Sequence, residues 1–288
     1  MPELPEVEVV KESLKNTIIN LIFKKVIINS NNLRYKINKR DLNKIINKKV
    51  LSITRRSKYL LINLSNKMTI VIHLGMTGKF FLVNKKNQIK KTSFYYQITK
   101  KDEKHNHVIF LLSNNVKLIY NDVRKFGFIK IILSGNIKQN AHFKILGPEP
   151  FSKNFNIKYF KNYLINKNRT IKDILMDQRF VSGLGNIYVN EVLFLSNIKP
   201  STNSKKIDDK KIKNIIKNTK QILKKSIKQG GSSIKNFNDS NGKQGHFQQN
   251  FRVYGKEGVK CHKGKCKGVI KRSFISNRST FFCSRCQK

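Results

Sequence analysis

The sequence predicts a multidomain α+β protein with an N-terminal helix, an antiparallel β-sandwich, a helical domain and a small cysteine-rich β-hairpin. Three observations support this prediction. Short β-rich runs fill residues 23–133, helical periodicity fills 156–229, and all four cysteines lie between residues 261 and 286. A chain of 288 residues with 39% apolar residues is long enough for two or three domains with ordinary cores.

The N-terminal segment combines a predicted helix with a possible nucleophile. Apolar residues recur at helical spacing at Val7, Val10, Leu14, Ile18 and Leu21. If Met1 is removed, Pro2 becomes a secondary amine beside Glu3, and an α-amino group with a pKa near ~8 is partly neutral at physiological pH. Such an amine forms a cationic iminium with a sugar aldehyde carbon, and this cation is an electron sink. The alternative is that the carboxylates only favour a helix N-terminus.

The region from Phe23 to Leu133 has the pattern of an antiparallel sandwich or barrel. Its β-rich runs are Leu51–Thr54, Tyr59–Leu64, Thr69–His73, Val108–Leu112, Val116–Tyr120 and Phe126–Leu133. The polar stretch Asn84–Lys91 is expected to be a solvated loop. His73 is expected to be packed or hydrogen-bonded in the core.

Glycine and proline separate this region from the helical one. Gly135, Gly147, Pro148 and Pro150 predict a linker rather than a regular element at 135–155. Helical periodicity then continues until Gly230 and Gly231 end it. The turn 183–186 contains two glycines, which allow backbone N–H groups to approach a phosphate at a helix N-terminus. The polar stretch 232–251 is expected to be functional or disordered.

The four cysteines, Cys261, Cys266, Cys283 and Cys286, predict one structural Zn²⁺ site. The chain begins without a basic segment followed by an apolar one, so we expect a cytoplasmic protein in which disulfides are disfavoured. A thiolate tetrahedron would hold a hairpin too small to fold alone. Four residues separate Cys261 from Cys266, which leaves His262 as an alternative ligand to Cys261.

The charge predicts a polyanionic partner. Sixty Lys and Arg residues against 16 Asp and Glu give a formal net charge of +44. Nucleic acid fits better than a membrane, because no apolar run approaches the length of a spanning helix. A general bias toward Lys, Asn and Ile would give the same charge without such a partner.

Several motifs together resemble one family. MPELPEVE resembles the start of formamidopyrimidine-DNA glycosylases, which are bacterial enzymes that excise oxidised purines and nick the strand. The likeness continues through RRSKYLLI, HLGMTGKF, DVRKFG, LGPEP, DQRFVSGLGNIYVNE, QGGSS, FRVYGKEG and the four-cysteine tail. The resemblance implies a catalytic β-sandwich domain at 1–134, a linker at 135–155, a helix-two-turn-helix domain with a lesion-capping loop at 156–251, and a zinc finger at 252–288.

The resemblance also implies roles for individual residues. Pro2 would be the nucleophile, Glu3 the general acid/base, and Lys58 and Arg278 would assist elimination and phosphate binding. The DNA-contacting residues would be His105, Arg124, Lys167, Asn186, Met76 and Phe126. Among these, Met76, Arg124 and Phe126 would fill the stack after base extrusion. The alignment near Lys167 can slip by one residue, which leaves Asn168 as the alternative.

The resulting prediction is a monomeric, bifunctional DNA glycosylase and abasic-site lyase that acts on damaged double-stranded DNA. Two alternatives stay open. An endonuclease VIII-like glycosylase would share the architecture but prefer oxidised pyrimidines. A non-catalytic, zinc-dependent nucleic-acid-binding protein would explain the charge and the cysteines but not the N-terminal motif. Taken residue by residue without the resemblance, Lys58 would be a solvated charge, and Met76 and Phe126 would be ordinary core residues.

Overall fold

The computed structural model describes residues 2–83, 89–91, 100–232 and 246–288. The chain forms two compact units. The first unit contains Met1–Lys144 and Gln229–His246, and the second contains Ile145–Lys228 and Phe247–Lys288. The mixed α+β class that the sequence predicts is confirmed, with antiparallel sheets, a helical region and a C-terminal hairpin.

The first unit begins with helix α1 (Leu4–Ile18), as the apolar periodicity predicts. It starts before the first periodic residue because Glu3 is the N-cap and Pro5 lies in the first turn. The Glu6 carboxylate accepts a hydrogen bond from the Glu3 backbone N–H at 2.8 Å, as in a capping box. The cap therefore fixes the direction in which the chain leaves the helix toward Pro2.

Two antiparallel sheets form the rest of this unit. One has the strand order β1-β7-β8-β5-β6 and the other β2-β3-β4-β9. The first sheet contains β1 (Phe23–Ile28), β5 (Lys79–Val83), β6 (Ile89–Lys91), β7 (Asn106–Leu112) and β8 (Lys117–Asn121). The second contains β2 (Val50–Arg56), β3 (Tyr59–Leu64), β4 (Met68–His73) and β9 (Phe128–Leu133). The short helix α2 (Lys39–Asn43) lies between β1 and β2 in the chain.

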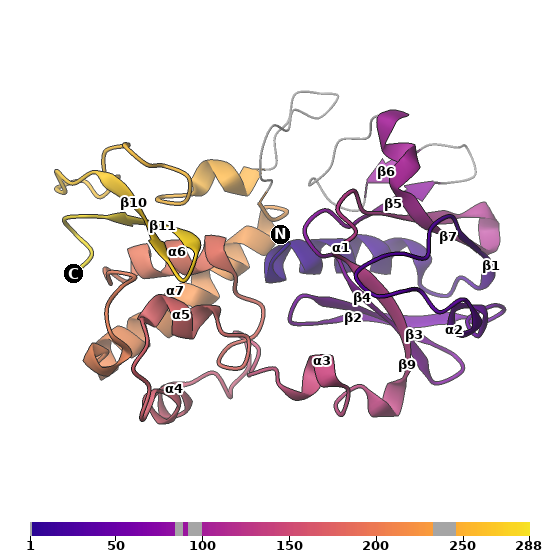
Figure 1. Ribbon diagram of the computed structural model, residues 1–288, viewed down its shortest axis with the longest axis horizontal. Coiled ribbons are helices and arrows are strands. Elements are labelled where there is room, and N and C mark those ends of the chain that lie inside the picture. Colours follow the sequence, from indigo (N-terminus) through magenta and orange to yellow (C-terminus); the bar gives the residue numbers. More distant parts are fainter. Residues whose placement is uncertain (1, 84–88, 92–99, 233–245) are drawn as a thin grey trace. The chain divides into compact units, whose positions relative to one another are not determined.

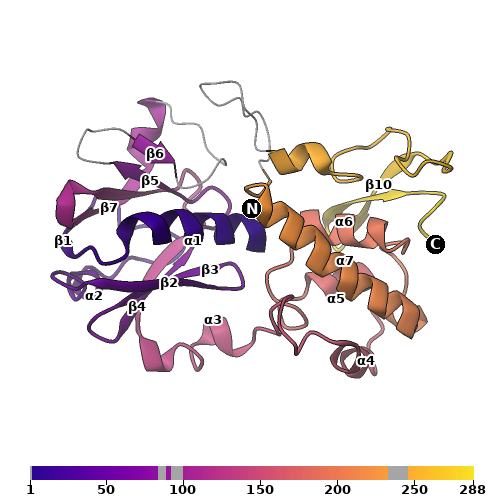
Figure 2. The same cartoon turned by 180° about the vertical axis from the view of Figure 1, so that it is seen from behind.

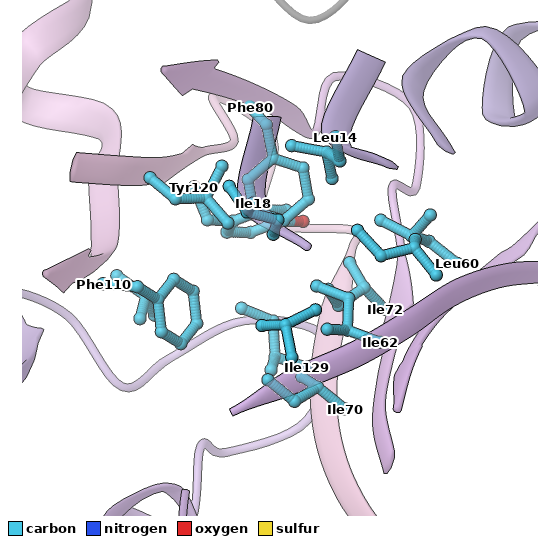
Figure 3. Close-up of a cluster of buried hydrophobic side chains, with 14 of the residues drawn as sticks. Leu14, Ile18, Leu60, Ile62, Ile70, Ile72, Phe80, Phe110, Tyr120 and Ile129 are labelled. Carbon is cyan, nitrogen blue, oxygen red and sulfur yellow. The ribbon is translucent and has the colours of Figure 1, made fainter. Parts of the chain in front are cut away.

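A single buried cluster joins the two sheets and α1. Leu14 and Ile18 of the helix belong to it with Phe80, Phe110 and Tyr120 of one sheet. The other sheet contributes Leu60, Ile62, Ile70, Ile72 and Ile129. Figure 3 shows these side chains pointing toward one another, and Figures 1 and 2 show α1 running beside both sheets. The position of α1 is thus set by burial on both sides.

Two expectations about irregular segments were wrong in part. Within the expected loop Asn84–Lys91, residues 89–91 form strand β6 and pair with Phe81, Leu82 and Val83 of β5. Residues 84–88 lie outside the described residues. Within the expected linker, Ala141–Lys144 form helix α3, because Phe143 is buried and the Asn140 side chain accepts the His142 N–H at 3.0 Å. Both elements are short. Strand pairing or tertiary packing stabilises them although their local sequence is polar.

The second unit contains four longer helices. They are α4 (Ile157–Leu164), α5 (Ile171–Met176), α6 (Asn186–Leu195) and α7 (Asp209–Lys228). Ile212, Ile215, Ile222 and Leu223 of α7 are buried, as its periodicity predicts. Helix α6 is buried on nearly all sides. It therefore forms the centre on which the other elements of this unit pack.

The C-terminal hairpin pairs β10 (Ile270–Ile275) with β11 (Arg278–Cys283) in antiparallel register. A buried carboxylate on α6 fixes the chain that leads to it. Glu191 accepts hydrogen bonds from the backbone N–H groups of Arg252, Val253 and Tyr254 at 2.8–3.0 Å. Burial nevertheless raises the pKa of the Glu191 carboxyl. Glu191 thus anchors the start of the cysteine-rich segment to the helical core.

Candidate active site and nucleic-acid interface

The N-terminus of α1 places a proline and two carboxylates in a buried setting. Pro2, Glu3 and Glu6 are all buried. The second oxygen of Glu6 accepts hydrogen bonds from both the backbone N–H and the hydroxyl of Ser232, each at 2.8 Å. Gly231 has φ +80°, and a Cβ there would lie 3.2 Å from the Glu6 carboxylate. Glu6 therefore joins the segment that carries Pro2 and Glu3 to residues 231–232.

Lys58 lies in the tight turn between β2 and β3, and only 6% of it is exposed. It is therefore not a solvated surface charge. Ser57, just before it, is buried and has φ +56°. Arg55 holds this turn, since its Nη1 donates to the Ser57 carbonyl at 2.8 Å and its Nε donates to the Glu8 carboxylate at 2.6 Å. These contacts connect the turn that presents Lys58 to the second turn of α1.

His73, at the end of β4, is a neutral and well-packed side chain. Burial, together with the nearby charges of Lys58, Arg34 and His142, lowers its pKa to about 4. Its Nδ1 accepts the Gly75 backbone N–H at 3.1 Å, and its ring stacks on Phe128 at a centroid distance of 5.7 Å. The expectation of a packed, hydrogen-bonded histidine is confirmed.

Two loops that follow β4 and β8 are tied together by one buried aspartate. Asp122 accepts hydrogen bonds from the Thr77 hydroxyl and, at 2.8 Å, from the Gly127 backbone N–H. Thr77 in turn accepts the Arg124 backbone N–H at 2.9 Å. Gly75 has φ +62°, and a Cβ on it would lie 2.4 Å from the Gly127 nitrogen, so only glycine permits this approach. The two loops therefore form one platform, which we call the wedge platform (residues 74–78 and 122–127).

The wedge platform presents three side chains to solvent. Met76 is 39% exposed and Phe126 is 46% exposed, so neither is an ordinary core residue. The Arg124 guanidinium lies 4.7 Å from the centre of the Phe126 ring. His105 ends the short 3₁₀ helix Lys100–His105, and its carbonyl accepts the Asp122 backbone N–H at 3.1 Å. The first unit thus brings Met76, Arg124, Phe126 and His105 to one region.

In the second unit, the tip of the hairpin is anchored to helices α5 and α6. The Asn186 side-chain amide donates to the Ser279 carbonyl at 2.9 Å. The buried amine of Lys172 donates to that carbonyl at 3.2 Å and to the Thr280 hydroxyl at 2.7 Å. Burial lowers the Lys172 pKa to about 8. Arg278, which precedes this anchored residue, is exposed.

Lys167 and Asn168 differ in what surrounds their side chains. The Lys167 amine lies 5.4 Å from the centre of the Tyr163 ring. The Asn168 carbonyl oxygen accepts the Asn203 amide at 2.6 Å. Asn168 is exposed but already hydrogen-bonded to Asn203, whereas Lys167 carries the positive charge that suits a phosphate contact.

The four cysteines form one cluster. Their Sγ atoms all lie within 4.8 Å of one another. The Cys261–Cys286 distance is 3.8 Å and the Cys266–Cys283 distance is 3.6 Å. A tetrahedron of thiolates at ~2.3 Å from a Zn²⁺ ion has S–S distances of ~3.8 Å, so the donor set fits a metal ion. Cys261 belongs to the cluster, whereas the neighbouring His262 is exposed.

One expected segment cannot be compared with the structure, and four residues that support the candidate site were not singled out from the sequence. Most of the expected capping loop, residues 233–245, lies outside the described residues. Glu6, Asp122, Lys172 and Glu191 hold the candidate site residues in place but did not stand out in the sequence. The three-residue spacing of Glu3 and Glu6 is the one local signal that predicts such a role, because it matches a capping box.

Comparisons with known proteins extend over the whole chain. Residues 1–129 match the formamidopyrimidine-DNA glycosylase N-terminal domain, and residues 146–238 match the formamidopyrimidine-DNA glycosylase H2TH domain. The formamidopyrimidine-DNA glycosylase of Rickettsia bellii is 41% identical over 288 residues, covering 100% of both chains. Among the described residues, no helix is long and apolar enough to span a bilayer.

Solved structures with the same fold include two DNA complexes of Lactococcus lactis Fpg. The complex of Lactococcus lactis Fpg with abasic-site DNA is 32% identical, with a TM-score of 0.84 and 99% of both chains covered. The complex of wild-type Lactococcus lactis Fpg with N7-benzyl-Fapy-dG DNA is 33% identical, with a TM-score of 0.84 and 100% of both chains covered. The similarity therefore includes the sheets, the helices and the hairpin.

The lowered pKa of His73 predicts acid sensitivity. Because its folded pKa is about 4 and its unfolded pKa is 6.5, the unfolded state binds the proton more readily. The free energy of unfolding should fall as pH drops from ~6.5 to ~4, by up to about 3 kcal/mol. Urea titrations at several pH values would measure this. His73→Asn should remove most of the dependence, whereas an unchanged slope in this variant would assign the effect elsewhere.

Proposed function

The chain belongs to the formamidopyrimidine-DNA glycosylase family, and on this premise we propose how its own residues carry out base excision and strand cleavage. It is a base-excision DNA glycosylase, and abasic-site lyase activity is typical of its family. We propose oxidised purines in duplex DNA, including 8-oxoguanine and formamidopyrimidines, as its substrates. The observation that carries the mechanism is the buried N-terminus of α1, where Pro2 and Glu3 are held by the capping box and by Ser232.

The first step requires loss of Met1, which leaves Pro2 with a secondary amine. Its nitrogen attacks the sugar C1′ and the glycosidic bond breaks. The electron pair of this bond leaves with the base, which takes up the proton that the Pro2 nitrogen gives up. Opening of the sugar ring then gives an iminium that is permanently cationic. Glu3 is the only other titratable group on the chain between Pro2 and Glu6, and as general acid/base it exchanges a proton with the sugar ring oxygen.

The second step uses the iminium as an electron sink. Removal of a sugar proton expels the 3′ phosphate, and a further elimination expels the 5′ phosphate and leaves a one-nucleotide gap. Lys58 supports these steps because its buried amine is held in a rigid turn. Arg278 is proposed to bind a phosphate that flanks the lesion, since its guanidinium projects from the anchored hairpin tip.

The wedge platform supplies the groups that replace an extruded base. Met76 and Phe126 are exposed apolar side chains, and Arg124 stacks on Phe126 with its charge toward solvent. We propose that His105, Lys167 and Asn186 contact the phosphates. Enzymes that extrude a base from duplex DNA pay its unstacking energy, and side chains that fill the vacated stack offset part of this cost.

The cysteine cluster is proposed to hold one structural Zn²⁺ with Cys261, Cys266, Cys283 and Cys286 as ligands. Bound Zn²⁺ would stabilise the hairpin that carries Arg278. We also propose that the domains of the chain end at residues 134, 155 and 251 and that the protein lies in the bacterial cytoplasm.

The central experiment traps the proposed iminium. Borohydride added during turnover reduces it to a stable amine, so a protein–DNA adduct should form on duplex DNA with 8-oxoguanine opposite cytosine. Peptide mapping should place the adduct at Pro2, and Pro2→Gly should trap poorly because its primary amine gives an iminium that can lose a proton. Glu3→Gln should bind the lesion without releasing the base.

The controls separate the competing functions. Intact mass must first show that Met1 has been lost. An adduct mapped to Lys58 would identify Lys58 as the nucleophile. Stronger trapping on oxidised pyrimidines than on 8-oxoguanine would favour an endonuclease VIII-like specificity. No adduct on any damaged duplex would leave a nucleic-acid-binding protein without catalysis.

The wedge platform has its own test. Met76→Ala and Phe126→Ala should slow excision from duplex DNA by roughly tenfold while changing cleavage of a pre-formed abasic site much less, because extrusion is the step these side chains serve. Single-turnover rates on the two substrates give the comparison. Equal losses on both, together with a lowered melting temperature, would assign these residues to stability instead.

Removal of the metal tests the cysteine cluster. Purified protein should contain one Zn²⁺ per chain. Chelation should weaken DNA binding while the β-sheet circular dichroism signal, which comes mainly from the two sheets of the first unit, is retained. Cys261→Ser should lose zinc, whereas the matched variant His262→Ala should keep it. Full affinity in zinc-free protein would contradict the proposed structural role.

A further inference from the structure

A small pocket in the second unit, beside Arg278, is lined mainly by charged side chains. Its volume is about 280 Å³, and its lining includes Arg169, Arg179, Arg278, Asp173 and Asp177. Three guanidinium groups against two carboxylates leave a net positive charge. The catalytic and wedge assignments above use only Arg278 from this group, so the other two arginines have no role in them.

One carboxylate orients both of these arginines. Asp177, directly after α5, accepts Arg179 Nε at 3.0 Å and Nη2 at 2.8 Å. It also accepts Arg169 Nη1 at 3.0 Å. Its side chain is only 8% exposed, and hydrogen bonds from Arg179 hold the pKa of this carboxyl far below its usual range. The carboxylate therefore stays ionised and keeps both side chains in fixed directions.

The two arginines nevertheless remain open to solvent. The Arg179 side chain is 65% exposed and that of Arg169 is 42% exposed. A guanidinium has five N–H donors, and the contacts within the described residues occupy two on each of these arginines. Planar guanidinium groups that are oriented and only partly used are well suited to bind phosphate oxygens through paired hydrogen bonds.

Resting on the proposed function, we propose that Arg169 and Arg179 form an additional subsite for one backbone phosphate of the bound DNA, next to the phosphate contact of Arg278. The Asp173 carboxylate accepts the Thr170 hydroxyl at 2.7 Å, and the pocket keeps a net positive charge because three guanidinium groups outnumber its two carboxylates. Asp177 is then a positioning residue, whose negative charge is offset by the two guanidinium groups that it holds.

Salt dependence of DNA binding tests this subsite directly. The ligand is a duplex with a tetrahydrofuran abasic analogue, which lacks the C1′ hydroxyl and cannot form the iminium. Each neutralised phosphate contributes ~0.9 to the slope of log K against log salt concentration. Arg179→Ala and Arg169→Ala should each lower the slope by ~0.9 and weaken binding roughly tenfold at ~0.1 M salt. The double variant should lose the same ~0.9, because both side chains serve one phosphate.

Variants that keep the charge or the fold sharpen the result. Arg179→Lys should keep the slope but lose part of the affinity, since an ammonium lacks the planar fork. Asp177→Asn removes one negative charge yet should bind DNA more weakly, because the arginines lose their orientation. Tighter binding by Asp177→Asn would show that net charge alone matters and would overturn the proposal.

The controls distinguish this inference from the function on which it rests. Arg40→Ala removes an exposed arginine of the first unit and should leave the slope of log K against log salt concentration unchanged. The subsite is contradicted if Arg40→Ala lowers this slope as much as the double variant does, or if the double variant does not lower it. Selective competition by potassium phosphate over potassium chloride at equal ionic strength would assign the pocket to free phosphate. Borohydride trapping by the double variant at saturating DNA should remain intact. If the wild-type protein neither binds nor traps damaged DNA, the proposed glycosylase and lyase function is itself contradicted.

Discussion

The Glu6 carboxylate holds the N-terminus of α1, with Pro2 and Glu3, in place. One of its oxygens accepts the Glu3 backbone N–H, and the other accepts two donors of Ser232, which is 226 residues away in the chain. A buried carboxylate with three donors is stable, whereas the same donors without it would lose their partners in a buried region. Glu6 thereby joins the segment that carries Pro2, the proposed nucleophile, to residues 231–232.

The same principle recurs at the other functional elements. The chain has 60 basic residues and only 16 acidic ones, so most positive charges face solvent or a polyanion rather than a carboxylate. Several of the few carboxylates are buried where they orient a loop or a cation. Asp122 joins the two loops of the wedge platform, Glu191 anchors the start of the cysteine-rich segment, and Asp177 holds two arginines. Organisation by carboxylates leaves the excess positive charge available for DNA.

The two units use different means to present their charged groups. In the first, Lys58 is buried in a turn that Arg55 and Glu8 fix against α1, so its position is set by the fold. In the second, Arg278 is exposed at a hairpin tip whose next residue is held by Asn186 and Lys172. A buried amine suits proton transfer near a sugar, and an exposed guanidinium suits a phosphate. The chemistry proposed for each residue thus agrees with its degree of burial.

The sequence by itself determined the elements whose signals are local. The periodicity of Leu14 and Ile18 predicts α1, the β-rich runs predict most strands, and the cysteine positions predict one cluster, because each pattern depends on neighbours within a few residues. The N-terminal motif likewise indicated the family. Only the tertiary structure decided that one lysine among many is buried, that Met76 and Phe126 are exposed, and that residues 89–91 form a strand. Burial and pairing of this kind depend on partners far away in the chain, such as Ser232 for Glu6, and no local pattern encodes them.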